Sequence, residues 1–207
     1  MKLIKAEEII FHFFIFSILT IVGIQTHEIS HYIVADILKF KPLLHHSSVS
    51  FQFIEMKNNK DYQFNELLII IAGPLQTIFT GIFGFIMLSY RRQYRLESKF
   101  TKLDWFAVFL TLFLLRQVFN LMTSLIKSVK ISGVYFGGDE AKISEKLGIF
   151  HGTFGIITGT TALIICSITF FYFIPKTKRL NLILGATFGS IISYYLWSFY
   201  IGEIVLP

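Results

Sequence analysis

Two histidines and a glutamate of this sequence stand at a spacing that suits metal chemistry. His27, Glu28 and His31 form an H-E-x-x-H motif at the far end of a long apolar run. On a helix, residues four apart project from one face, so two imidazole nitrogens can take two corners of a tetrahedral zinc site. Glu28 can then act as general base toward a metal-bound water. The alternative is a set of polar residues at a helix end that face headgroups or a neighbouring helix.

A zinc site built on this motif needs a third ligand, because the motif supplies only two. Asp139 lies in a segment, 127–151, that is too polar to span a membrane and carries several glycines. Asp139 is therefore a candidate third ligand. The alternative is that Asp139 is the N-cap of a helix over 140–147. Other nitrogen donors are expected in loops or interfaces: His45, His46 and His151.

The elements that must position these residues are membrane helices. Of the 207 residues 54% are hydrophobic and 15% are charged, whereas soluble domains carry about 25% charged residues. We expect an all-α polytopic membrane protein of about five transmembrane helices with a short membrane-surface β-hairpin between the first two. The apolar runs are about 8–38, 67–90, 105–126, 153–174 and 182–205. They leave no room for a soluble domain, so residues 1–207 form one membrane-embedded domain, with a catalytic core at about 8–150 and a C-terminal helix pair at about 152–205.

The net charge of +6 does not indicate a nucleic-acid partner. The lysines and arginines cluster in short loops between apolar runs, where they face lipid headgroups. Their distribution slightly favours a cytoplasmic N-terminus and leaves the orientation open. We expect an integral, multi-pass protein of a bacterial cell membrane, whose partners are the lipid bilayer and a membrane-protein or transmembrane-peptide substrate, with no nucleic acid and no nucleotide.

The polar segment after the first helix has strand character. Residues 47–55 alternate polar and apolar side chains, which is typical of a half-buried strand. Residues 58–61 supply turn chemistry, and 62–64 could form the returning strand. The open edge of such a hairpin could accept an extended peptide by strand addition. A plain amphipathic loop is the alternative.

Two later runs carry features that are unusual at membrane depth. Gly73 and Pro74 interrupt the backbone hydrogen bonds of the second helix. In the third run Arg116, Gln117 and Asn120 share one helical face, which should look into the bundle or into a wet cavity. The alternatives are a kink without function and polar contacts that hold helices together.

The last two runs have structural features. Gly155 and Gly159, and likewise Gly185 and Gly189, have the spacing that lets membrane helices pack closely. Cys166 is the one cysteine and lies within an apolar run, so we expect a buried, inert thiol.

Taken together, these residues resemble the site-2 protease (M50) family of intramembrane zinc metalloproteases. That family is marked by H-E-x-x-H on a membrane helix, a helix with Gly-Pro next in order, and a later D-G-x-[R/K] motif. The matching residues, within roughly 15–150, are His27-Glu28-x-x-His31, Gly73-Pro74 and Asp139-Glu140-Ala141-Lys142. The resemblance implies that His27, His31 and Asp139 bind Zn²⁺ and that Glu28 activates water. It also implies that Asn120, with Gly73 and Pro74, helps to hold substrate.

The sequence departs from the family pattern at two points. The family has Asn-x-x-Pro close before the aspartate, whereas no proline follows Asn120 here and 19 positions separate it from Asp139. Glu140 replaces the usual glycine and is itself a possible ligand. The last two helices match the family only in hydropathy.

The function expected on this basis is that of a metalloendopeptidase. Zinc-dependent hydrolysis would cleave a peptide bond of a membrane-protein substrate, whose helix must first unwind. Two other functions remain open: a catalytically inactive membrane scaffold of the same fold, and a small transporter, which the broken second helix and the polar face at 116–120 would suit.

Overall fold

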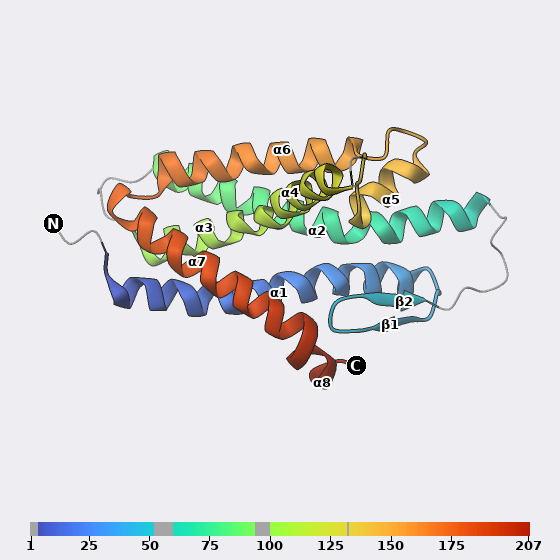
Figure 1. Cartoon of the computed structure of the whole chain (residues 1–207), viewed down its shortest axis with the longest axis horizontal. Coiled ribbons are helices and arrows are strands. Elements are labelled where there is room, and N and C mark those ends of the chain that lie inside the picture. Colours follow the sequence, from blue (N-terminus) through green and yellow to red (C-terminus); the bar gives the residue numbers. More distant parts are fainter. Residues whose placement is uncertain (1–3, 52–59, 94–99, 132) are drawn as a thin grey trace.

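A computed structural model of the chain describes residues 4–51, 60–93, 100–131 and 133–207. In this described part the chain forms helices and one small sheet (Figure 1). Five stretches are long and apolar enough to cross a membrane: Ala6–Ile37, Tyr62–Arg92, Lys102–Lys130, Thr153–Phe173 and Lys176–Val205. The predicted all-α polytopic fold with a short hairpin is confirmed, and the chain is a multi-pass membrane protein.

The first helix, α1 (Ala6–Ile37), has 32 residues, more than the roughly 20 that cross a bilayer. It was predicted to run to about Leu38, and it ends one residue earlier. Lys39 takes a left-handed conformation with φ 64°. The N–H of Phe40 then donates to the carbonyl of Ala35 at 2.9 Å. This is a Schellman motif built on a lysine instead of the usual glycine.

The hairpin lies between the first two helices, as predicted, but the prediction of which segment pairs with the alternating strand was wrong. Strand β1 (Pro42–Leu44) pairs antiparallel with β2 (Val49–Phe51). The predicted returning strand at 62–64 is helical, because α2 begins at Lys60 and runs to Gln93. The strand that pairs with the alternating segment therefore comes before it in the chain. In the turn between the two strands, the N–H of His45 donates to the carbonyl of Ser48 at 2.9 Å. Residues 52–59, with part of the predicted strand and turn, lie outside the described residues.

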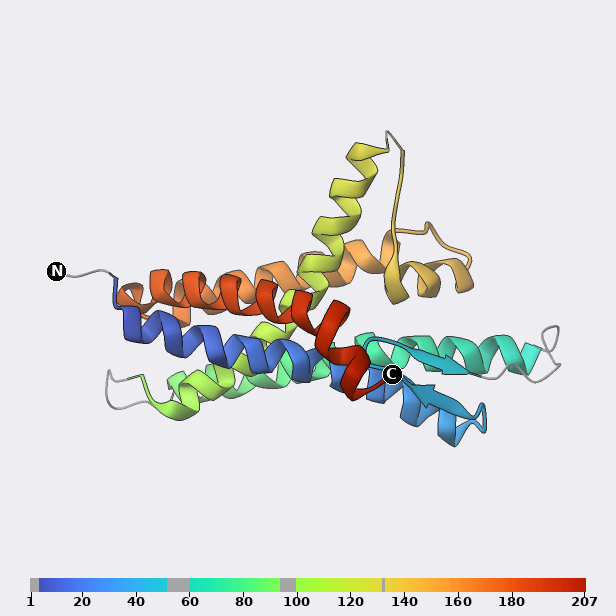
Figure 2. The ribbon, with the colours of Figure 1, turned by 60° about the horizontal axis from the view of Figure 1, so that its bottom comes forward.

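The third span is bent. It consists of α3 (Lys102–Thr111), a 3₁₀ turn η1 (Leu112–Leu114) and α4 (Leu115–Lys130). Figure 2 shows α4 rising steeply away from the direction of the other long helices. The bend follows the change from i→i+4 to i→i+3 hydrogen bonds at η1. The bend places the start of α4, which carries the polar face at 116–120, beside the middle of the bundle.

The remaining helices complete the bundle. A short helix, α5 (Gly138–Lys146), precedes α6 (Thr153–Ile168) and α7 (Lys176–Leu196). The last two continue into π-helical turns, η2 (Thr169–Phe173) and η3 (Trp197–Ile201), and α8 (Gly202–Val205) follows. In Figure 1, α7 crosses α1 diagonally, and α6 runs along the opposite side of the molecule.

Glycines allow two pairs of helices to pack closely. A Cβ on Gly185 of α7 would lie 2.5 Å from the carbonyl oxygen of Ile9 on α1, and one on Gly189 would overlap the backbone of Phe13. A Cβ on Gly159 of α6 would lie 2.7 Å from Cβ of Leu121 on α4. The predicted packing role holds for these three, whereas Gly155 has room, with its nearest neighbour atom at 3.7 Å.

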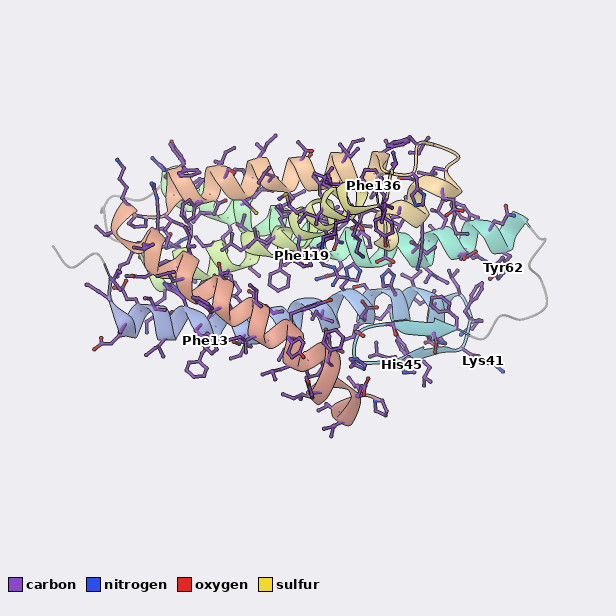
Figure 3. The ribbon with its side chains drawn as sticks, in the orientation of Figure 1. Phe13, Lys41, His45, Tyr62, Phe119 and Phe136 are labelled. Carbon is purple, nitrogen blue, oxygen red and sulfur yellow. The ribbon has the colours of Figure 1, made fainter. Side chains whose placement is uncertain are left out.

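The buried hydrophobic core is small, because many apolar side chains of the helices face outward instead. One buried cluster contains Phe16, Leu88, Val108 and Ile174, and a second contains Cys166, whose thiol is buried as predicted. Large apolar side chains also point outward from the helices (Figure 3). In a bilayer such side chains contact acyl chains, so the specificity of helix packing comes from small residues and polar contacts.

We predict that Gly189→Ala destabilises the α1–α7 pair, because its methyl group would overlap the Phe13 backbone, which cannot rotate away. The expected cost is about 1–3 kcal/mol. The same change at Gly23 of α1 is the matched control, since its Cβ would meet only ordinary contact with Phe113 at 3.7 Å. Thermal unfolding of both variants in one detergent measures the difference, and equal melting temperatures would contradict this packing.

Candidate metal centre

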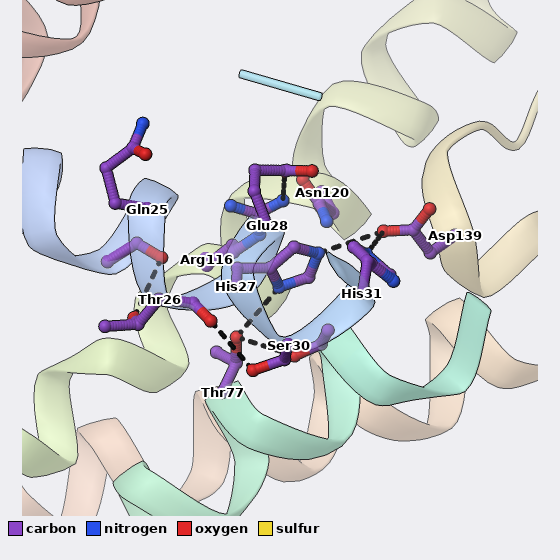
Figure 4. A network of polar contacts seen from close by, with 12 residues as sticks. Gln25, Thr26, His27, Glu28, Ser30, His31, Thr77, Arg116, Asn120 and Asp139 are labelled. Carbon is purple, nitrogen blue, oxygen red and sulfur yellow. Dashed lines mark hydrogen bonds and ion pairs between the residues drawn. The ribbon is translucent and has the colours of Figure 1, made fainter. Parts of the chain in front are cut away.

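The two histidines of α1 and an aspartate of α5 converge on one point (Figure 4). Both imidazoles are buried, and their ring centroids lie 4.8 Å apart. Asp139 Oδ2 lies 3.0 Å from Nε2 of His27 and 3.4 Å from Nε2 of His31. The three potential ligand atoms all lie within 4.8 Å of one another. This His27–His31–Asp139 group could bind a metal ion.

Helix α2 orients both imidazoles. His31 Nδ1 lies 2.6 Å from the carbonyl oxygen of Ile69, and His27 Nδ1 lies 3.1 Å from Thr77 Oγ1. A carbonyl only accepts, and the Thr77 hydroxyl donates its own proton to the carbonyl of Gly73 at 3.2 Å. His31 Nδ1 must therefore carry a proton, and the Thr77–Gly73 hydrogen bond favours a proton on His27 Nδ1 as well. Nε2 is then the nitrogen of each ring that can bind a metal ion, in place of its contact with Asp139.

Gly73 leaves the space in front of the two Nε2 atoms open. A Cβ at this position would lie 2.5 Å from Nε2 of His27 and closer still to Nε2 of His31. Any other residue would place its side chain between the imidazoles and a shared ligand. The predicted importance of the Gly-Pro pair thus has a geometric basis at Gly73.

Pro74 does not end α2, which is helical on both sides of it. The proline has no N–H, so the carbonyl of Ile70 loses its helical donor and this turn is loosened. The adjacent carbonyl of Ile69 is the one that accepts the His31 proton. The predicted interruption of the helix therefore lies beside the site, and it contributes to the site through the backbone.

Asp139, rather than Glu140, reaches the histidines. The alternative role as N-cap is wrong, because Gly137 is the N-cap of α5 and Asp139 lies inside its first turn. Gly138, with φ 78°, allows the chain to enter the helix in this orientation. Burial favours the neutral acid, but hydrogen bonds with His27 and His31 outweigh it and hold the pKa of Asp139 well below its usual value. The carboxyl group is therefore ionised at neutral pH, as a ligand must be.

Contacts to two other helices hold α5 in place. Lys146 Nζ pairs with Glu66 Oε2 of α2 at 2.7 Å. Ser144 Oγ, which is buried, accepts a hydrogen bond from the N–H of Phe154 at the start of α6 at 3.0 Å. Ile143 is fully buried in the same helix. These contacts place Asp139 against α1 from outside the spanning helices.

Glu28 is buried beside the ligand group and contacts a cation. Glu28 Oε1 lies 3.8 Å from Nη2 of Arg116, at the start of α4. Glu28 follows His27 directly, so it projects about 100° further round α1. Figure 4 shows its carboxylate on the side of the His27 ring that faces α4. A carboxylate beside two possible metal ligands and close to one guanidinium can accept and return a proton at this site.

Asn120 faces Glu140 instead of the ligand group. Its Nδ2 lies 3.4 Å from both carboxylate oxygens of Glu140. Burial, together with the charge of Asp139, raises the pKa of Glu140 against the opposing effects of Arg116 and Asn120. Gln117, also buried, makes no side-chain hydrogen bond in the described part of the chain. All three line a small pocket between α4, α5 and α6, so the predicted polar face of the third span does look into the bundle.

Three other histidines lie away from the ligand group. His45 Nδ1 donates to the carbonyl of Pro207 at 2.7 Å, and His151 Nε2 to that of Phe136 at 3.1 Å. The carbonyl of His46 accepts from the indole of Trp197 at 2.9 Å. Their roles are in loops and interfaces, as predicted.

Three contributors to the site were not predicted from the sequence: Thr77, the carbonyl of Ile69 and the support of α5 through Glu66. Thr77 stands one helical turn after Gly73, which places it on the same face of α2, and this spacing is the one available signal. A carbonyl group leaves no trace in a sequence. Comparison of the chain with protein-family models, curated proteins and solved structures finds no match among any of them.

We predict that Thr77→Val lowers the affinity for a divalent metal ion by about 10- to 100-fold, because His27 loses the acceptor that keeps its proton on Nδ1. Valine has nearly the same shape as threonine, so the packing of α2 is kept. Titration with Zn²⁺ against a competing chelator measures the change. Thr80→Val, on the same helix with a hydroxyl that contacts Gln76, is the control. An affinity equal to that of the unsubstituted protein would contradict the hydrogen-bond assignment.

We predict that Gly73→Ala abolishes tight metal binding, because its methyl group would occupy the space in front of both Nε2 atoms. Alanine is a better helix former than glycine, so the variant should keep its helical circular dichroism. Equilibrium dialysis with Zn²⁺, alongside Gly23→Ala, separates a blocked site from a misfolded chain. Full metal occupancy of Gly73→Ala would show that the ion binds elsewhere.

Proposed function

We propose that this chain is a zinc-dependent intramembrane endopeptidase that hydrolyses a peptide bond of a membrane-protein substrate. The observation that carries this proposal is the convergence of His27, His31 and Asp139 on one point beside Glu28. The sequence supplies the same residues in the order that resembles the site-2 protease family. The site also lies on a membrane-spanning helix, where buried ionisable residues are costly and usually functional.

The donor set suits zinc. Two imidazole nitrogens and one carboxylate oxygen form a three-ligand set typical of catalytic zinc, which leaves a fourth position open. Two ligands of a tetrahedral zinc ion with bonds of about 2.0 Å lie roughly 3.3 Å apart. The Nε2–Oδ2 distances of 3.0 and 3.4 Å lie on either side of this value. The protons on both Nδ1 atoms, directed at Thr77 and Ile69, support the same assignment.

The roles of the protein groups follow from their positions. A zinc ion bound here would acidify a water and polarise the scissile carbonyl. Glu28 accepts a proton of that water and delivers it to the nitrogen of the leaving amine. The Nδ1 atom of each imidazole is engaged by an acceptor on α2, so Nε2 is the nitrogen left to bind the ion. The open space beside Gly73 lets the ligand atoms share one ion.

Two features bear on how a membrane-protein substrate would bind. A membrane-protein helix must unwind before a peptide bond is accessible, since helical carbonyls are engaged in hydrogen bonds. The two-stranded sheet next to α1 has outer edges that can pair with an extended segment. Asn120, predicted to hold substrate, faces Glu140 in this structure, so its part in binding requires that contact to open.

We predict that purified protein binds one zinc ion per chain and that His27→Ala loses it, whereas Glu28→Gln keeps it. Glu28→Gln should reduce cleavage of a transmembrane-peptide substrate by at least about 1,000-fold, because the variant loses the carboxylate that takes the proton. Zinc content by mass spectrometry and cleavage by gel shift are the measurements.

The outcomes separate the three functions. Zinc binding without cleavage of any tested transmembrane peptide would favour the inactive scaffold. No tight zinc, together with substrate-dependent transport into vesicles, would favour the transporter. Cleavage by Glu28→Gln at the rate of the unsubstituted protein would refute the proposed mechanism.

A further inference from the structure

Arg116 places a guanidinium group beside the proposed general base, inside a membrane-spanning segment. Its Nη2 lies 3.8 Å from Glu28 Oε1, and its side chain is 29% exposed. Its Nε is buried and makes no hydrogen bond to any described residue. Arg116 stands in the first turn of α4, directly after the bend at η1.

The contact with Glu28 does not saturate the guanidinium. Arginine carries five N–H donors, and a distance of 3.8 Å exceeds hydrogen-bond length. An arginine that served only to neutralise a carboxylate would form the short, two-pronged pair that these groups prefer. A pair of that kind would also make Glu28 a weaker base. The observed geometry leaves Nε without a hydrogen bond to any described residue and Nη2 beyond hydrogen-bond distance of Glu28.

The proposed reaction creates an anion that such donors fit. When water adds to the carbonyl carbon, the C–O π electrons move to the carbonyl oxygen, which becomes negative. The C–N bond then breaks, the electrons return, and the amine leaves with the proton that Glu28 took from the water. The products are a carboxylic acid and an amine. Donors fixed at the developing negative charge stabilise this transition state.

We propose that Arg116 is a catalytic residue that donates hydrogen bonds to the oxygen of the scissile carbonyl as it gains charge. This inference rests on the proposed peptidase function and deepens it. The neighbouring amides are already directed elsewhere, because Asn120 faces Glu140 and Gln117 is buried in the pocket next to Glu140. Buried Leu114, at the end of η1, and buried Gln117 lie on either side of Arg116 in the chain and fix the backbone from which its side chain extends.

The test compares two inhibitors on zinc-loaded protein that already carries Glu28→Gln and so cannot turn over. A peptide phosphonate presents a tetrahedral centre with anionic oxygens, whereas a peptide thiol offers a single sulfur to the metal and no such oxygen. Arg116→Gln is expected to weaken phosphonate binding about 100-fold, as loss of an oxyanion donor does, and to leave thiol affinity and zinc content unchanged. Arg92→Gln is the matched control. Arg92 is an arginine at the end of α2 whose guanidinium stacks on the ring of Tyr172 instead of facing Glu28.

In the active protein, Arg116→Gln should lower kcat by about 100- to 1,000-fold with little change in KM. Unchanged phosphonate binding would overturn the assignment, and so would equal loss of both inhibitors, which would mean that Arg116 acts on the structure of the site. A loss of phosphonate affinity that appears only when Glu28 is intact would mean that Arg116 acts through Glu28. If neither inhibitor binds before Arg116 is changed, the peptidase function itself fails, and the role of Arg116 fails with it.

Discussion

The close approach of Gly73 to the two imidazoles is the contact on which the candidate metal centre depends. Helices α1 and α2 pack so that the α-carbon of Gly73 faces both Nε2 atoms, with no room for a methyl group. The same turn of α2 supplies the Ile69 carbonyl that orients one ring, and Thr77, one turn later, orients the other. A single backbone approach thus creates the space for a shared ligand and directs the lone pairs into it.

The membrane makes this arrangement demanding. An unsatisfied polar group in hydrocarbon costs several kcal/mol, so each imidazole must find partners for both nitrogens within the protein. Pro74 removes one backbone hydrogen bond of α2 next to the site, so carbonyl groups of that turn are more accessible as acceptors. The bend at η1 serves the same end on the third span, because it brings the polar face of α4 to the site. At Pro74 and at η1, irregular backbone therefore lies close to polar side chains of the site.

The sequence predicted more of the fold than of the site's surroundings. The five apolar runs correspond to the five stretches that can span a membrane, and glycine spacing predicted close helix packing at Gly185 and Gly189, which the structure places against α1. The hairpin's partner strand was missed, because three residues at 42–44 carry too weak a pattern to compete with 62–64. At the site, the His27–His31 spacing and the choice of Asp139 came from local sequence. Thr77 and the Ile69 carbonyl did not, since they matter only once α2 lies against α1.

The third ligand belongs to a different kind of element from the first two. His27 and His31 lie on a long helix held by α2 and α7, whereas Asp139 lies on a nine-residue helix held by a few contacts such as Lys146–Glu66. An ion that binds all three residues joins α5 to α1, so its binding free energy also stabilises the docked position of α5. Metal binding and the position of α5 are therefore thermodynamically coupled.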